Sequence, residues 1–303
     1  MKKKILNIVA AIALVMIMAV GCSAKEEVIK DREGRDITLP SKIDKIISTA
    51  PSNTEVIVAL GLADKLIAVD KYSADVEGIP NDIEFIDFSN PDAEAIVELN
   101  PDIIIASGHN KTGSTEDPFK LVEEAGISVA YIPSSDSIQG IYDDIMFISK
   151  VTNTEEQGKT IVSDMKTKVE DIAEKAKTIN EKKKVYFEIG PAPNLYSFGN
   201  STFLNEMIEL IGAENILKDE TAWISPSAEI IIDKNPDVII TNVGYIDNPT
   251  DEIKSREGWE NINAIKNNEV YQVDKNSSSR PSQNIITALN EMSEAIYPHV
   301  YSK

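Results

Sequence analysis

A thirteen-residue pattern occurs twice in the chain and constrains the fold more than any other feature. The segment AEAIVELNPDIII (Ala93 to Ile105) recurs as AEIIIDKNPDVII (Ala228 to Ile240) in the second half of the chain, with eight of thirteen positions identical. In each copy a helical pattern stops before a proline, and a run of β-branched apolar residues follows. Such a run is typical of a strand buried in a parallel sheet. The repeat therefore predicts two related α/β lobes.

A second, weaker pair supports this division. TEVIVALG (Thr54 to Gly61) resembles NEMIELIG (Asn205 to Gly212), and each is a helical pattern that ends at a glycine. Strands are expected at 45–48, 66–69, 103–106, 128–132, 185–189, 238–241 and 270–273, and helices at 53–60, 93–99, 116–125, 202–211, 228–234, 259–266 and 283–295. This alternation predicts parallel sheets that helices cover on both faces.

The stretch 137–180 connects the two lobes. Isoleucines at 138, 141, 145 and 148 share one helical face, and Thr154 can cap a second apolar run that extends to Ile172. A helical connection is a semi-rigid spacer, so the lobes should keep a nearly fixed separation. The predicted organisation is a signal segment at 1–21, a tether at 22–30, an N-terminal lobe at 31–136, a connecting helix at 137–180 and a C-terminal lobe at 181–303.

The start of the chain, up to Cys22, has the features of an export signal. Lys2 to Lys4 precede the uncharged run Ile5 to Val20, which is shorter than the roughly 20 residues that a spanning helix needs. The segment Ala19-Val20-Gly21-Cys22 resembles a bacterial lipoprotein cleavage box. That resemblance implies that Cys22, the only cysteine, carries lipid and anchors an extracytoplasmic protein to the cell membrane. An ordinary cleaved signal and an uncleaved anchor are the alternatives.

The composition excludes several classes of partner. Removal of residues 1–21 takes away three lysines and leaves 27 basic against 50 acidic residues, a net charge of −23. A chain this acidic does not bind nucleic acid or anionic lipid through a general basic field. With 42% hydrophobic residues it can bury a core. One cysteine and two histidines exclude a metal site rich in these residues, so no intrinsic cofactor is expected.

Taken together, these features resemble the class III solute-binding proteins of ABC importers, which bind cobalamin, ferric siderophores or haem. The resemblance runs from about Val28 to Pro298. It is carried by KIISTAPSNTEVIVALGLADKLIAVD, by VYFEIGPAPNLYSFGNSTFLNEMIELIGAENI, by the two NPD segments and by the opening DREGRDITLP. It implies an α/β fold of two Rossmann-like lobes with parallel central sheets, joined by a long rigid helix.

The resemblance also implies a function. A monomeric lipoprotein would bind a bulky metal chelate, a corrinoid or an iron siderophore, between its lobes and pass it to an ABC permease and its ATPase. A haem receptor of the same family and a ligand-sensing lipoprotein are the alternatives. An enzyme is not expected, because the G-x-S-x-G elbow, the P-loop and the G-x-G-x-x-G motif are all absent from the sequence.

Aromatic and polar residues lie in the loops that follow the predicted strands. In open α/β sheets, ligands bind beyond the carboxyl ends of strands, and two such ends facing each other form a cleft. The candidate ligand contacts are Tyr72, Phe88 and His109 from the first lobe and Tyr196, Phe198, Trp223, Tyr245 and Arg280 from the second. Aromatic rings offer flat, rigid surfaces suited to a macrocycle or chelate. Alternatively, each ring caps the core beneath its loop.

The few cationic candidates bear on the ligand. The candidate site contains one histidine, His109, which alone cannot coordinate a bare metal ion, so any metal must arrive already chelated. A tri-anionic catecholate would need several cations, because unpaired charge is costly in a half-buried cleft. Arg280 with many aromatic rings favours a corrinoid or a ferric hydroxamate, although Arg280 could instead be structural.

The family resemblance further implies that one surface glutamate on each lobe pairs with arginines of the permease. Glu116 follows Asn100, and Glu252 follows Asn235, at nearly the same spacing and each at the start of an expected helix. These two residues are the predicted docking pair. The alternative is that they only stabilise their helices, since acidic residues are favoured near helix N-termini.

Overall fold

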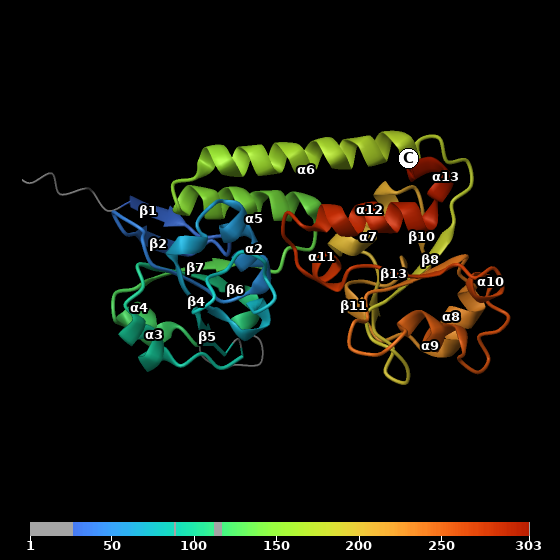
Figure 1. The fold of residues 1–303 in the computed structure, drawn as a ribbon, viewed down its shortest axis with the longest axis horizontal. Helices are drawn as coiled ribbons and strands as arrows, with labels where there is room; N and C mark the ends of the chain where they lie inside the picture. Colours follow the sequence, from blue (N-terminus) through green and yellow to red (C-terminus); the bar gives the residue numbers. More distant parts are fainter. Residues whose placement is uncertain (1–26, 88, 112–116, 303) are drawn as a thin grey trace, which may run out of the picture.

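Two separate parallel β-sheets form the centres of two lobes (Figure 1). The computed structural model describes residues 27–87, 89–111 and 117–302. Within them, the first sheet has the strand order β5-β4-β3-β6-β7 and the second has the order β10-β8-β12-β13. Every pair of neighbouring strands in both sheets is parallel. The predicted α/β fold with two parallel-sheet lobes is confirmed.

The N-terminal lobe contains β3 (Ile46–Ser48), α2 (Pro51–Ala59), η1 (Ala63–Lys65), β4 (Leu66–Asp70), η2 (Lys71–Ser73), β5 (Glu84–Ile86), α3 (Ala93–Leu99), β6 (Ile103–Ser107), η3 (Gly108–Lys111), α4 (Lys120–Glu124) and β7 (Ser128–Ile132). The C-terminal lobe contains β8 (Lys184–Glu188), β9 (Ser197–Phe198), α7 (Phe203–Leu210), β10 (Glu214–Asn215), β11 (Trp223–Ile224), α8 (Ala228–Lys234), β12 (Val238–Thr241), α9 (Pro249–Lys254), α10 (Asn263–Lys266), β13 (Val270–Gln272), α11 (Lys275–Ser279), α12 (Ile285–Ile296) and α13 (Pro298–Tyr301).

The repeated motif has the same structural role in both lobes. Asn100 and Asn235 follow α3 and α8 with φ angles of 50° and 49°, a left-handed conformation that asparagine tolerates and that ends a helix. Asp102 Oδ2 accepts hydrogen bonds from the backbone N–H groups of Asp44 (2.7 Å) and Lys45 (2.9 Å), just before β3. Asp237 Oδ2 accepts one from Lys184 N–H (2.9 Å), at the start of β8. The NPD sequence therefore ties a helix end to the neighbouring strand.

One hydrophobic core extends through both lobes. Alternate residues of β6 and β12 face opposite ways: Ile103, Ile105, Val238 and Ile240 join a shared core, whereas Ile104 and Ile239 join clusters confined to their own lobes. The shared core also includes the buried faces of α2, α7 and α12 and of the connecting helices. The inner face of each sheet therefore packs into the same continuous core.

The connection between the lobes consists of two antiparallel helices. Where one connecting helix was expected at 137–180, α5 (Ile138–Val151) and α6 (Glu155–Ala176) are joined by a turn in which Asn153 has a φ of 56°. A Cβ at Gly158 would collide with the Ser149 side chain, so the glycine allows the two helices to pack closely. α6 runs along α5 and on to the C-terminal lobe (Figure 1), where Tyr301 Oη donates to the carbonyl of Ile172.

The start of the described chain differs from the expectation. β1 (Glu27–Lys30) and β2 (Asp36–Leu39) form an antiparallel hairpin, so the last residues of the predicted 22–30 tether belong to the folded domain. The backbone groups of residues 27–30 pair with those of β2, and the polar composition of this segment does not reveal that pairing. The predicted signal segment and Cys22 lie outside the described residues. In the described part of the chain, no helix has the length and apolar character needed to cross a membrane.

The contribution of the Asp102 hydrogen bonds to stability can be measured. Asp102→Ala removes the acceptor for two backbone N–H groups and should lower the free energy of unfolding by about 1–2 kcal/mol. Asp102→Asn retains an acceptor oxygen and is the matched control, with an expected loss of about 0.5 kcal/mol. Urea unfolding followed by circular dichroism gives both values. Equal midpoints for Asp102→Ala and the parent chain would show that the tie contributes nothing.

Candidate functional site

A cavity of about 500 Å³ lies between the lobes. The N-terminal lobe contributes the segments that follow β3, β4, β6 and β7, which include Tyr72 and His109. The C-terminal lobe contributes α11 and the residues after it, which include Lys275 and Arg280. The cavity therefore lies beyond the carboxyl ends of parallel strands, as expected for ligand sites in this class of sheet. It brings together three of the predicted contact residues: Tyr72, His109 and Arg280.

Buried hydrogen bonds fix the loops that carry Tyr72 and His109. Asp70 is fully buried, and its Oδ1 accepts from Tyr72 N–H at 2.8 Å. Burial raises the pKa of Asp70, although hydrogen bonds from Ser73 and Tyr72 oppose the shift. The backbone N–H of His109 donates to Ser107 Oγ at 3.2 Å. Tyr72 and His109 therefore stand on segments held by the lobe beneath them, with the Tyr72 side chain more than half exposed.

Aromatic residues gather on a small ribbon of the C-terminal lobe. β9 and β11 pair antiparallel, with Phe198 opposite Trp223. The Tyr196 and Trp223 rings stack with their centroids 6.4 Å apart and their planes 16° apart. The Phe198 and Trp223 rings pack edge to face, with their centroids 6.0 Å apart. In Figure 1 this ribbon lies on the side of its lobe that faces the N-terminal lobe. We call Tyr196 and Trp223 the ring platform.

The predicted aromatic contacts divide into exposed and buried rings. Tyr196, Trp223 and Tyr245 have exposed side chains, whereas Phe198 is fully buried. Phe198 also packs against Phe187 at 5.4 Å, so it supports the ring platform from below and presents no face to the cleft. Phe88 lies outside the described residues.

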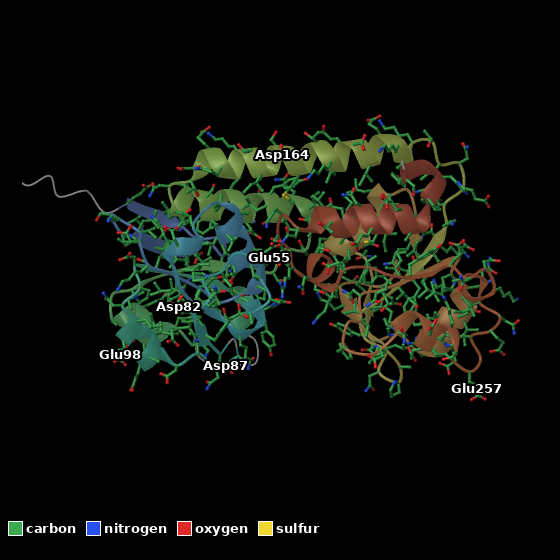
Figure 2. All side chains as sticks on the ribbon, in the orientation of Figure 1. Glu55, Asp82, Asp87, Glu98, Asp164 and Glu257 are labelled. Atoms are coloured by element: carbon green, nitrogen blue, oxygen red, sulfur yellow. The ribbon has the colours of Figure 1, made fainter. Side chains whose placement is uncertain are left out.

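Arg280 is engaged by the opposite lobe. Its Nη1 lies 2.9 Å from Glu55 Oε1 and its Nη2 lies 2.6 Å from Asp75 Oδ1. Glu55 projects from α2 toward the C-terminal lobe (Figure 2). Burial would raise the pKa of Asp75, but hydrogen bonds from Arg280 and Asn276 outweigh it and hold the pKa below its usual range. Two carboxylates therefore compensate the positive charge of Arg280.

The predicted docking residue Glu252 takes part in a partly buried ion cluster. Arg256 donates Nε–H to Glu252 Oε1 at 2.9 Å and forms two bonds of 2.6 and 2.7 Å with Glu188. The Glu188 side chain is 1% exposed, and burial raises its pKa despite the arginine. Arg256 also lies over the Trp259 ring at 4.6 Å. Glu252, about one third exposed, thus stabilises its own lobe. The other predicted docking residue, Glu116, lies outside the described residues.

Glu55 and Asp75 are site residues that were not predicted from the sequence. Glu55 is a buried acid on a helix whose neighbours Val56 and Ile57 are also buried. A carboxylate among apolar residues is a signal that a partner exists, because an unpaired buried charge is costly. Nothing in the sequence identifies that partner. Among the described residues, no group of three or more His, Cys, Asp or Glu side chains is placed to hold a metal ion.

The two tryptophans provide a test of the ring platform. The side chain of Trp223 is 45% exposed, whereas that of Trp259 is 2% exposed. Iodide should therefore quench part of the emission of the ligand-free protein, and Trp223→Phe should remove nearly all of the quenchable part. Trp259→Phe is the matched control and should leave the quenchable part of the emission unchanged. Quenching that survives Trp223→Phe would show that the indole of Trp223 is not the one exposed to solvent.

Comparisons with known proteins agree with this geometry. The periplasmic binding protein family model matches residues 46–277. An uncharacterized ABC transporter substrate-binding lipoprotein of Bacillus subtilis, YvrC, is 34% identical over 321 residues, covering 99% of this chain and 100% of its own length. The vitamin B12-binding protein of Yersinia pestis is 27% identical over 208 residues, covering 68% of this chain and 72% of its own.

A solved structure shows the same arrangement of lobes. The crystal structure of a possible iron-binding (periplasmic solute-binding) protein from Staphylococcus epidermidis has a TM-score of 0.75 and 31% identity. The match covers 85% of this chain and 100% of that one. The chain therefore belongs to the periplasmic binding protein family, whose members bind substrates without transforming them, and is related to the substrate-binding lipoproteins of ABC transporters.

Proposed function

We propose that the protein is the extracytoplasmic substrate-binding component of an ABC importer and that lipid on Cys22 holds it at the cell membrane. The proposed ligand is a bulky metal chelate bound between the lobes. The ring platform of Tyr196 and Trp223 is the observation that carries this proposal. Its two exposed rings stack beside the β9–β11 ribbon, and β11 lies on the side of the C-terminal lobe that faces the other lobe (Figure 1).

The ring platform suits a large, flat ligand. Stacked aromatic side chains provide a broad apolar face, and Tyr196 adds a hydroxyl group that can hydrogen-bond at its edge. Across the cleft, Tyr72 and His109 line the cavity on fixed loops. A chelate held between these two sides would bury much of its surface, as pockets between domains commonly allow.

The charges that line the cavity favour a ligand of low charge. Lys71 is paired with Asp87 at 2.8 Å, and Arg280 is paired with Glu55 and Asp75. Of the described residues that line the cavity, Lys275 and His109 are the remaining candidate cations. A tri-anionic catecholate would need more positive charge than they supply. We therefore propose a corrinoid or a ferric hydroxamate as the ligand, in line with the related vitamin B12-binding protein.

Docking to the permease is the second part of the proposal. Glu116 and Glu252 are the pair predicted from the sequence, and Glu252 already binds Arg256. The repeat offers another pair, because Glu94 and Glu229 occupy the same position in its two copies. Both are exposed and lie in the first turn of α3 or α8. These helices lie on opposite lobes, at the side of the molecule away from α6 (Figure 1). We favour Glu94 and Glu229 as the docking pair.

Ligand choice can be measured by titration of the soluble chain from Ser23, which contains every described element. Cyanocobalamin, a ferric hydroxamate, a ferric catecholate and haem should be compared by tryptophan quenching. We expect saturable binding of the corrinoid or the hydroxamate with a Kd below about 1 μM, or about −8 kcal/mol. Trp223→Ala, measured by isothermal titration calorimetry because it lacks the reporting indole, should weaken binding about tenfold or more, since it removes one of the two stacked rings.

Trp259→Phe is the control and should leave the affinity unchanged. Preferred binding of the catecholate would contradict the charge argument, and preferred binding of haem would favour the alternative receptor. Binding that is unaffected by Trp223→Ala would place the ligand elsewhere.

The docking proposal predicts a separation of uptake from binding. The double variant Glu94→Gln with Glu229→Gln should reduce ligand uptake about tenfold or more in cells that contain the permease. Each substitution removes a charge that would pair with the permease. Ligand affinity of the isolated protein should not change. The double variant Glu116→Gln with Glu252→Gln is the matched comparison. Loss of uptake in this second variant alone would restore the original pair.

A further inference from the structure

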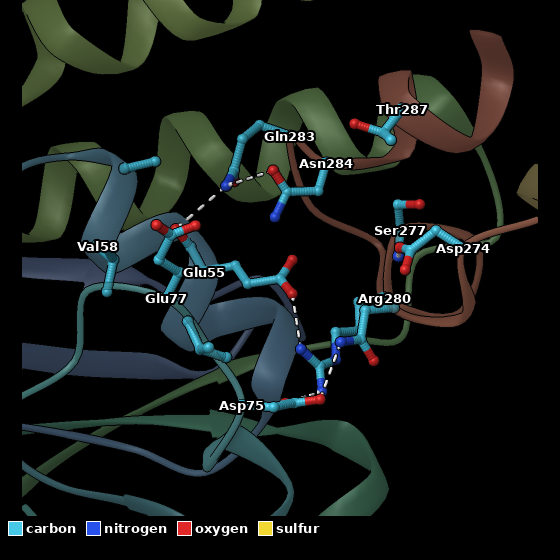
Figure 3. A pocket seen from close by; sticks show the side chains of 13 residues that line it. Glu55, Val58, Asp75, Glu77, Asp274, Ser277, Arg280, Gln283, Asn284 and Thr287 are labelled. Atoms are coloured by element: carbon cyan, nitrogen blue, oxygen red, sulfur yellow. Dashed lines mark hydrogen bonds and ion pairs between the residues drawn. The ribbon is translucent and has the colours of Figure 1, made fainter. Parts of the chain in front are cut away.

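A set of polar contacts links the two lobes beside the cavity. Arg280, just after α11 of the C-terminal lobe, lies between Glu55 and Asp75 of the N-terminal lobe (Figure 3). These residues are separated by 225 and 205 positions in the chain. They also line a second cavity, of about 390 Å³, on the other side of the arginine.

Every carboxylate oxygen of Glu55 and Asp75 accepts a hydrogen bond from the C-terminal lobe. Arg280 donates to Glu55 Oε1, and Ser282 Oγ donates to Glu55 Oε2 at 2.5 Å. Arg280 also donates to Asp75 Oδ1, and Asn276 Nδ2 donates to Asp75 Oδ2 at 2.9 Å. Both acids are therefore fully engaged by one short segment, residues 276–282, of the opposite lobe.

The buried part of these contacts is Arg280 with Glu55. Their side chains are 12% and 5% exposed, whereas that of Asp75 is 58% exposed. In a desolvated pair, loss of one partner leaves the other charge buried and uncompensated, so such pairs resist separation. An exposed pair is screened by water and contributes less. If the lobes separated at this point, the Glu55 carboxylate would either become exposed to water or stay buried without its partner.

The same arginine also holds the loop that carries Tyr72. Arg280 Nη2 donates to the carbonyl oxygen of Tyr72 at 3.1 Å, and Asp75 lies slightly further along this loop. The ring of Tyr72 is exposed and lines the cavity between the lobes. The loop that carries this ring is therefore held by Asp70 of its own lobe and also by a contact that crosses from the other lobe.

We propose that Arg280, Glu55 and Asp75 form a clamp that holds the two lobes in one fixed arrangement before any ligand binds, with Arg280 as a second anchor of the Tyr72 loop beside Asp70. The chain passes between the described lobes once, through α5 and α6, and the lobes share a core; the clamp is a further, polar link at the edge of the cleft. The role of Arg280 is then to set the width of the cleft and not to pair with the ligand.

The clamp can be tested without any ligand, so the result does not depend on the proposed function. The mature chain with Cys22→Ser has no native cysteine, which permits spin labels at Glu98→Cys and Glu257→Cys. Both residues are exposed and lie on different lobes (Figure 2). Electron–electron double resonance would then report the distribution of distances between the lobes.

We expect one narrow distance distribution in the parent protein. Arg280→Gln and Glu55→Gln should each produce a second or clearly broadened population. Combining the two changes should have no greater effect than either alone, because both break the same contact. Arg280→Lys, which keeps the charge, should restore much of the narrow population. Glu77→Gln, which lines the same second cavity, is the control and should match the parent.

Identical distributions in the parent, Arg280→Gln and Glu55→Gln would overturn the proposal. Circular dichroism establishes that each variant is folded. If a buried charged variant fails to fold, Ser282→Ala removes the hydrogen bond to Glu55 Oε2, and Asp75→Asn removes the exposed charge that pairs with Arg280. Each should still broaden the distribution, with a smaller effect for Asp75→Asn. Unchanged distributions in these two variants would then overturn it.

Ligand binding separates the clamp from a direct ionic role for Arg280. For whichever chelate binds, the clamp predicts that Arg280→Gln increases the dissociation rate about tenfold, whatever the charge of the chelate. An effect confined to anionic chelates, together with an unchanged distance distribution, would show that Arg280 pairs with the ligand and would overturn the clamp.

Discussion

The arrangement of the cleft depends on a hydrophobic core that the two lobes share. The inner faces of both sheets pack into it, together with α5, α6 and α12. Apolar surface buried in common ties the lobes together, because their separation would return that surface to water. The helical connection adds stiffness, since a paired helix cannot act as a flexible hinge. The clamp at Arg280 then fixes the opposite edge of the interface between the lobes.

This rigidity explains how a chain with few cationic groups in its cleft could recognise a large ligand. Rings that are already stacked, such as Tyr196 and Trp223, lose little conformational freedom on binding. The buried Phe198 packs beneath Trp223, and the pairing of β9 with β11 holds these two residues opposite each other. In the proposed function, recognition by shape and ring contact would replace recognition by charge, because Lys71 and Arg280 are already paired with carboxylates.

Local patterns in the sequence were enough to predict the bounds of several elements. α3, α8, β7 and β12 have the predicted bounds, because each is delimited by its own residues: the αL asparagine after the helix, and apolar runs between turn residues. The contact between Glu55 and Arg280 could not be predicted, because the two residues are 225 positions apart and no local sequence pattern relates them. The pairing of Glu188 with Arg256 is hidden for the same reason.

The aromatic candidates show a second limit of sequence reasoning. Tyr196 and Phe198 flank Ser197, an alternation that in a regular strand would place both rings on one face. β9 has only two residues and begins after Tyr196, so that rule does not apply, and Phe198 turns into the core while Tyr196 remains exposed. Which loop ring is a platform and which is a support is decided by tertiary packing.

A crystal structure of the complex with whichever chelate binds would test the central claim most directly. We predict that the chelate lies against the ring platform on one side and near Tyr72 and His109 on the other. The lobes should keep the arrangement seen here, with the contacts of Arg280 to Glu55 and Asp75 intact. A chelate bound away from the ring platform, or lobes rotated so that these contacts are broken, would contradict the account.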